Sequence, residues 1–207
     1  MSPRPYQLGQ RQAASEQTRS RVLRAARELL MESTSFSGFS IEAVARRADV
    51  ARMTVYHQFG SKIGLLEALC DSLAVTGEME QLASAFRRPD PVEGLDEYIR
   101  IFGHFWEADR LVTRRLRGLA ALDPDFEQVI RARDERRRKG LRVLVQRIVG
   151  EQNQTGPEAL DEIVNVLSAL LSFEYFEALA GPTRSLEDLV PLICRLSHRV
   201  LGMENNV

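Results

Sequence analysis

The sequence predicts an all-α fold of about nine helices, divided into a short basic head and a larger helical bundle. Alternating apolar and polar runs bounded by turn residues, the signature of strands, are almost absent. Apolar residues instead recur at spacings of three and four along nearly the whole chain. The charge is also uneven, because residues 1–62 carry ten Lys or Arg against five Asp or Glu. The remainder carries 18 against 24, so we expect the basic head to meet a polyanion.

Composition places the chain among ordinary globular proteins of one or two domains. It has 207 residues, of which 44% are hydrophobic and 28% charged. We expect no membrane span, because no apolar run approaches the length of about 20 residues that a bilayer requires. The N-terminus has no apolar core typical of a secretory signal. Cys70 and Cys194 match no metal or redox spacing. We therefore expect a cytoplasmic protein without a metal or cofactor.

The head is expected to contain three short helices after a disordered tail at 1–15. The first begins near Thr18, the second spans 41–48 and the third spans 51–58. The last two meet at Asp49, where the chain needs the left-handed backbone that Gly adopts best and Asp tolerates. Two helices this short, joined by so tight a turn, predict a helix-turn-helix within a domain at 16–62.

The bundle is expected to fill residues 63–207 with six helices. Ser61 is a good N-cap for the first of them, and Asp123 followed by Pro124 marks the start of the fourth. Their expected spans are 61–86, 92–109, a shorter helix ending near 122, 124–150, 158–180 and 186–200. The segment 158–180 is apolar on almost all sides, which indicates burial from more than one direction.

Residues 18–69 carry a motif that extends beyond the helix-turn-helix spacing. Its matching positions are Ala26, Leu29, Phe39, Ser40, Ile41, Val44, Ala45, Ala48, Thr54, Val55, Tyr56, Phe59, Ser61, Lys62, Leu65 and Leu66. In these positions the segment resembles the DNA-binding domain of the TetR/AcrR family of transcriptional regulators. The resemblance implies a divergent C-terminal half for ligand binding and dimerisation, and a fourth helix that moves when ligand binds. Asp49, Ala51 and Gly64 depart from the family pattern, which usually has Gly, Ser and an acidic residue there.

A helix of about two turns fits the major groove of B-DNA. We expect Arg52 to read guanine bidentately and Met53 to contact a thymine methyl group. Phosphate or mixed contacts are expected from Tyr56 and His57 on the outward face of the third helix and from Thr54 at its side. Ser40 and Lys62, at the starts of the second and fourth helices, are expected to contact phosphates. For Tyr56, packing with a solvated hydroxyl is the alternative.

The last two helices are expected to form a two-fold dimer interface, because one recognition helix reads too few base pairs for genomic specificity. The interface residues expected are Val166, Leu170, Phe173, Leu189, Ile193, Leu196 and Val200. The alternative is that these helices bury each other within one subunit.

Aromatic residues cluster in the bundle, where ligand sites are common. The residues expected to bind ligand are Tyr98, Phe102, His104, Phe105, Trp106, Arg114, Arg117, Phe173 and Phe176. We expect a small, largely apolar effector, with any anionic end facing Arg114 or Arg117. The alternative for each aromatic is a place in the plain core. The basic run at 131–139 is interpreted as a solvated helix face and not as a second nucleic-acid site.

These observations predict a homodimeric, ligand-responsive regulator that acts as a repressor on a near-palindromic DNA operator. An enzyme is not expected, because His57, His104 and His198 are scattered and no catalytic triad or phosphate loop is evident. The remaining alternative is a helical small-molecule carrier or adaptor that has lost specific DNA binding.

Overall fold

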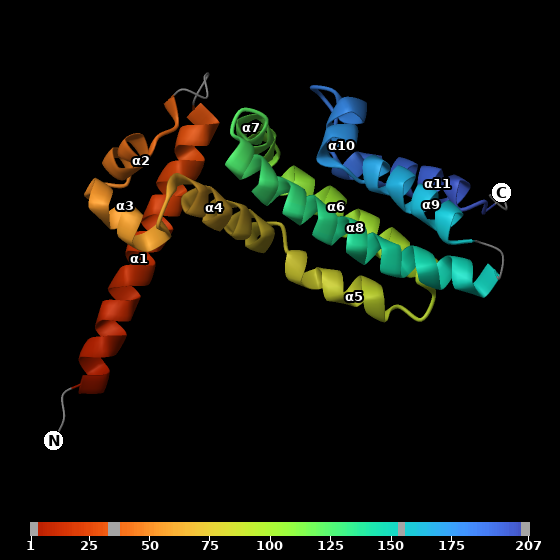
Figure 1. The fold of residues 1–207 in the computed structure, drawn as a ribbon, viewed down its shortest axis with the longest axis horizontal. Helices are drawn as coiled ribbons and strands as arrows, with labels where there is room; N and C mark the ends of the chain where they lie inside the picture. The colour runs from red at the N-terminus through yellow and green to blue at the C-terminus, as the bar shows by residue number, and fades with distance from the viewer. Residues whose placement is uncertain (1–3, 33–37, 153–155, 204–207) are drawn as a thin grey trace. The chain divides into compact units, whose positions relative to one another are not determined.

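The computed structural model describes residues 4–32, 38–152 and 156–203, and the regular structure in these ranges is helical (Figure 1). The elements are α1 (Arg4–Glu32), α2 (Ile41–Arg47), α3 (Arg52–Phe59), α4 (Lys62–Thr76), η2 (Met79–Gln81), α5 (Leu82–Arg87), α6 (Pro91–Ala108), α7 (Arg110–Ala120), α8 (Pro124–Gln152), α9 (Pro157–Leu170), α10 (Phe173–Ala180), η3 (Glu187–Leu189) and α11 (Val190–Val200). The all-α class predicted from the sequence is confirmed.

Two breaks raise the number of α-helices in the described ranges from the expected nine to eleven. The first follows α4, where Glu78 adopts a left-handed backbone with φ of 54°. Gly77 permits this turn, because a Cβ atom there would lie 2.6 Å from Cδ2 of Phe105. The second separates α9 from α10, where the Ser172 hydroxyl accepts a hydrogen bond from the Tyr175 N–H at 3.2 Å. The apolar periodicity of the sequence continues across both breaks. For this reason the sequence predicted one helix at 61–86 and one at 158–180, where the structure has two in each segment.

Helix α1 begins earlier than expected. The tail at 1–15 was expected to be disordered, but α1 includes residues 4–15. The side chains of residues 10–17 are exposed, whereas Val22, Ala26 and Leu30 are buried. The apolar stripe therefore begins where the sequence placed it, and the helix continues N-terminally from it.

The chain divides into two compact units. The first contains residues 1–72 and 111–127, and the second contains 73–110 and 128–207. The first unit thus takes in most of α4 and nearly all of α7, in addition to the expected domain at 16–62. Helix α4 contributes residues to both units.

The first unit builds its core from α1, α2, α3 and the start of α4. Its fully or almost fully buried side chains include Val22, Ala25, Ala26, Leu30, Ile41, Val44, Ala45, Val55, Leu65, Leu66 and Leu69. Asp49 has φ of 52°, which confirms the left-handed turn predicted between the second and third helices. This turn lets α2 and α3 pack on each other as a helix-turn-helix.

The second unit surrounds α6 with α5, α8, η3 and α11. Two glycines of α6 allow close approach: a Cβ on Gly94 would lie 2.7 Å from the Ala85 carbonyl oxygen, and one on Gly103 would lie 2.5 Å from Cγ2 of Val190. The first approach seats α5 against α6, and the second seats the start of α11. These glycines fix the spacing of the helices around the core.

No single helix in the described ranges is both long and apolar enough to cross a membrane. Helices α9 and α10 reach that length and composition only when taken together, and they bend by 50° at their break.

Replacing Gly94 by Ala should destabilise the protein by about 1–3 kcal/mol, because the new methyl group overlaps a backbone oxygen that cannot swing away. The matched control is Gly150→Ala in α8, where a Cβ meets nothing within 4 Å. That change should stabilise by roughly 0.5–1 kcal/mol through helix propensity. Urea denaturation followed by circular dichroism measures both, and equal stabilisation by the two changes would contradict the packing described.

Candidate functional site

Helix α3 is anchored by one face and exposed on the other. Val55 is fully buried, whereas Met53 is 71% exposed and Arg52 and His57 are also exposed. Thr54 and Tyr56 are half-buried at the edges of the exposed face. The five side chains expected to face DNA therefore lie on the solvent side of the helix or beside it. This arrangement leaves the outer surface of α3 free to enter a groove.

Arg52 is held in place by two neighbours. Its guanidinium lies 2.8 Å from the Glu42 carboxylate, and it donates a hydrogen bond of 3.1 Å to the Tyr56 hydroxyl. The guanidinium carbon also lies 5.2 Å from the centre of the Tyr56 ring. The hydrogen bond to Tyr56, followed by the charge of Glu42, raises the pKa of Arg52 above its ordinary value. Arg52 is therefore a permanent cation with a restricted orientation.

Ser40 and Lys62 occupy the two helix starts assigned to them. The Ser40 hydroxyl oxygen accepts a hydrogen bond of 3.1 Å from the Ala43 N–H and so caps α2. This bond uses an oxygen lone pair and leaves the hydroxyl proton available as a donor. Lys62 begins α4, and its ammonium lies 4.0 Å from the carboxylate of Asp123. Ser61 caps α4 as predicted, through a 2.9 Å bond from the Gly64 N–H.

A second set of contacts ties the end of α3 to α1, and the sequence did not reveal it. Arg19 lies over the Phe59 ring, 4.6 Å from its centre, and donates to the Gln58 carbonyl at 3.4 Å. The Gln58 amide donates to the Ser15 hydroxyl at 2.9 Å. Glu42 was likewise missed as the partner of Arg52. These contacts join residues that are distant in sequence, so periodicity does not indicate them. The only sequence signal was the acidic Glu42 within the basic head, which indicates a partner for a nearby cation.

The aromatic residues of α6 and α10 form the core of the second unit. Tyr98, Phe102, Trp106, Phe173 and Phe176 are buried, and Phe105 packs against them. Their polar atoms are satisfied internally, since the Tyr98 hydroxyl donates to the Arg137 carbonyl at 2.7 Å and the Trp106 N–H donates to that of Leu171 at 3.3 Å. Burial raises the pKa of Tyr98.

This placement supports the core alternative for these rings. The predicted partners Arg114 and Arg117 belong to the first unit, whereas the aromatic cluster belongs to the second. The structure therefore does not gather the expected ligand residues into one site within a unit. Ligand binding by these residues stays a prediction, because core and ligand-site aromatics share the same helical spacing.

The basic run at 131–139 is not uniformly solvated, contrary to expectation. Arg137 is buried, and its guanidinium lies 3.0 Å from the Asp134 carboxylate. The same guanidinium lies 5.6 Å from the centre of the Trp106 ring and 5.9 Å from that of Phe102. A charge run does not reveal which of its members turns inward, so the error follows from tertiary packing.

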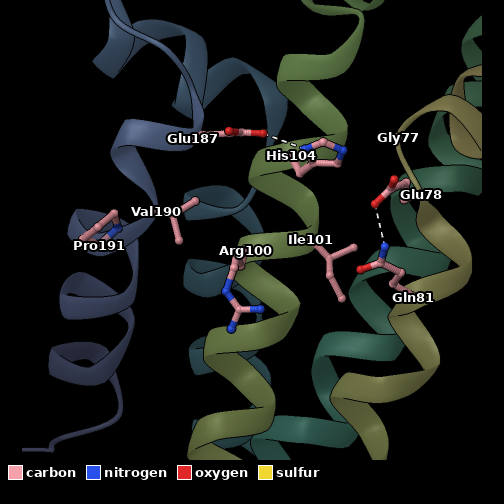
Figure 2. A pocket seen from close by; sticks show the side chains of 9 residues that line it. All are labelled: Gly77, Glu78, Gln81, Arg100, Ile101, His104, Glu187, Val190 and Pro191. Carbon is pink, nitrogen blue, oxygen red and sulfur yellow. Dashed lines mark hydrogen bonds and ion pairs between the residues drawn. The ribbon is translucent and has the colours of Figure 1, made fainter.

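A pocket of about 570 Å³ lies in the second unit (Figure 2). Its lining comes from three places: Gly77, Glu78 and Gln81 around η2, Arg100, Ile101 and His104 on α6, and Glu187, Val190 and Pro191 on η3 and α11. Of the residues expected to bind ligand, this pocket includes His104. The His104 ring lies 2.6 Å from the Glu187 carboxylate across one end.

The seven residues expected at a dimer interface divide into two groups. Phe173, Leu189 and Ile193 are buried in the core of the second unit, which supports the alternative of burial within one chain for these three residues. Val166 is 47% exposed, and Leu170, Leu196 and Val200 are partly exposed. Periodicity identified apolar helices but could not separate the face that packs inward from the face that remains outside.

Comparison with known proteins agrees with this geometry. The family model "Bacterial regulatory proteins, tetR family" matches residues 22–69. The HTH-type transcriptional regulator UidR of Escherichia coli strain K12 is 32% identical over 84 residues, which span 41% of this chain and 39% of that regulator. The match to this relative thus covers less than half of either protein.

Solved structures match over a larger share of the chain. The TetR family transcriptional regulator PfmR from Thermus thermophilus has a TM-score of 0.63 at 22% identity, covering 86% of this chain and 97% of PfmR. NalD, the secondary repressor of the MexAB-OprM multidrug efflux pump in Pseudomonas aeruginosa, has a TM-score of 0.67 at 19% identity, covering 90% and 96%. Residues 22–69 therefore match the tetR family model, and the chain has the fold of solved TetR-family transcriptional regulators.

Proposed function

We propose that the protein is a homodimeric, cytoplasmic transcriptional repressor that binds a near-palindromic operator and leaves it when a small effector binds. The observation that carries the proposal is α3, which exposes Arg52, Met53 and His57 while Val55 anchors it from behind. A short helix presented in this way fits the major groove, where base edges form a readable pattern.

Base reading is assigned to Arg52 and Met53. The guanidinium of Arg52 offers two parallel donors that match the O6 and N7 acceptors of guanine. Glu42 and Tyr56 restrict its orientation before DNA arrives, which reduces the conformational entropy lost on binding. On DNA, the guanine acceptors would bind the Arg52 guanidinium either in place of the Glu42 carboxylate or together with it. The exposed Met53 side chain suits apolar contact with a thymine methyl group.

Phosphate contacts are assigned to Ser40, Lys62, Thr54, Tyr56 and His57. Such contacts fix the register of the protein on the duplex without reading sequence. Lys62 would exchange its weak 4.0 Å interaction with Asp123 for a phosphate oxygen. If about 6–10 phosphates are neutralised per dimer, affinity should fall roughly 10³–10⁵-fold between 50 and 200 mM salt.

Dimerisation is assigned to α9 and α11, which pack on each other within the subunit. Val166 and Leu170 on α9, with Leu196 and Val200 on α11, remain exposed or partly exposed. A two-fold copy of this pair would form a four-helix interface and bury these side chains. Two recognition helices would then read two half-sites, which supplies the specificity that one helix lacks.

Selection of bound fragments from a random DNA pool, with purified protein at near-physiological salt, tests the proposal. Recovery of one near-palindromic site would support a dimeric regulator. If the folded protein enriches no site, with or without candidate small molecules, the result would contradict the regulator and favour the carrier function. The selected site also provides the probe for the variants below.

Arg52→Ala should lower affinity for the selected operator by about 1–3 kcal/mol per half-site and relax preference at one base pair in each half-site. Lys62→Ala should weaken all sequences alike and reduce the salt slope by about one per protomer. Arg87→Ala, an exposed cation of α5 in the second unit, is the control for loss of charge. Fluorescence anisotropy with operator and scrambled DNA at several salt concentrations measures each effect. If Arg52→Ala lowered the affinity for operator and scrambled DNA equally, Arg52 would not be a base-reading residue.

Val166→Arg should convert the dimer to monomers, because each charge would be buried opposite the two-fold-related apolar helix. Val143→Arg on α8 is the matched control, since Val143 is 48% exposed and Val166 47%. Sedimentation equilibrium measures the mass of each variant, and circular dichroism checks the fold. A Val166→Arg protein that remains dimeric would place the interface elsewhere.

A further inference from the structure

The pocket in the second unit has a defined floor and two walls (Figure 2). Helix α6 forms the floor with Arg100, Ile101 and His104. One wall is the turn after α4, and the other is the start of α11, where Val190 lies. Its volume of about 570 Å³ lies within the range of roughly 300–1,000 Å³ typical of small-molecule sites.

The charged side chains that line the pocket differ in whether they have a hydrogen-bond or ion-pair partner. Glu187 is paired with the His104 ring, and the Glu78 carboxylate accepts a hydrogen bond from the Gln81 amide. Arg100, in contrast, is exposed and makes no hydrogen bond or ion pair within the described ranges, and its side chain lies between the two walls in Figure 2. The Arg100 guanidinium is therefore a charged group of this lining that no other lining residue contacts by a hydrogen bond or ion pair, although its charge acts on Glu97 from a distance.

The lining also restricts the ligand that can supply the counterpart. A carboxylate matches the guanidinium fork through two parallel hydrogen bonds. Ile101 and Val190 offer apolar surface beside it, which suits a hydrocarbon body. Glu78 and Glu187 line the same pocket, so a second negative charge on the ligand would be repelled. Phosphate esters and dicarboxylates are disfavoured for this reason.

We propose that this pocket binds a small organic monocarboxylate with an apolar body, and that this ligand is the effector. Arg100 binds the carboxylate, and Ile101 and Val190 cover the hydrocarbon part. The effector role rests on the proposed function, whereas binding itself does not. The pocket also includes Gly77, which directly follows α4, the helix that begins at Lys62. A ligand in this position would contact the turn that ends a helix shared by both units.

Isothermal titration of the full-length protein with three probes of equal chain length tests the binding. Hexanoate should bind, whereas hexanamide lacks the charge and hexyl phosphate carries excess charge, so both should bind at least tenfold more weakly. Arg100→Gln should weaken hexanoate binding about tenfold or more, and Arg87→Gln should leave it unchanged. Equal binding of hexanoate and hexanamide, or an unaffected Arg100→Gln variant, would overturn the proposal, as would absence of hexanoate binding.

A second measurement separates the site from its regulatory role. Hexanoate should lower the affinity of the wild-type protein for the selected operator, and Arg100→Gln should bind that operator normally but lose the response. Hexanoate binding without any change in operator affinity would overturn the effector role. Hexanoate binding by a protein that selects no operator would overturn the proposed function and leave the carboxylate site intact.

Discussion

The fold of the first unit depends on contacts that hold α3 in place, because this helix is too short to be stable by itself. Helix α3 has eight residues, well below the length of about 12–15 at which an isolated helix becomes marginally stable in water. One buried side chain, Val55, anchors its centre, and the contacts of Arg19 and Gln58 tie its end to α1. Because these contacts lie on the inner face and at the end of α3, its outer face remains exposed.

The same constraint explains the unusual residues around α3. Ala51 at its N-cap provides no side-chain hydrogen bond, and Asp49 before it adopts the left-handed backbone that favours Gly. Each departure makes the conformation at the start of α3 less favourable by a free energy on the order of 1 kcal/mol. Tertiary packing compensates for it, since α2, capped by Ser40, lies against α3 across the turn. A conformation that is locally unfavourable is thus maintained by the surrounding core.

The sequence predicted those features that depend on local chemistry. The spans 41–48 and 51–58 lie within about a residue of the observed α2 and α3, and Asp123 with Pro124 marked the start of α8 correctly. It did not predict breaks at which apolar periodicity continues, as after Thr76. The sequence also could not show which side chains of a helix face the core. Arg137 is buried while its neighbours in the basic run are not, and Ile193 is buried while Val200 is partly exposed. These outcomes depend on which helices become neighbours, and periodicity alone contains no information about that.

In the proposed regulator, α4 is the element that would couple the ligand site to the DNA site. Its first eleven residues belong to the first unit, to which DNA binding is assigned in the proposed function, and its last four belong to the second unit, which contains the pocket. Leu65, Leu66 and Leu69 are buried at one end, and Gly77 packs closely against Phe105 just beyond the other. Close packing resists gradual displacement, so movement at either end favours a discrete repacking. A ligand can shift such an equilibrium only by its difference in affinity for the two arrangements. A coupling of about 1–3 kcal/mol, which changes DNA affinity roughly 5–150-fold, lies within the reach of one guanidinium–carboxylate contact and a few apolar contacts.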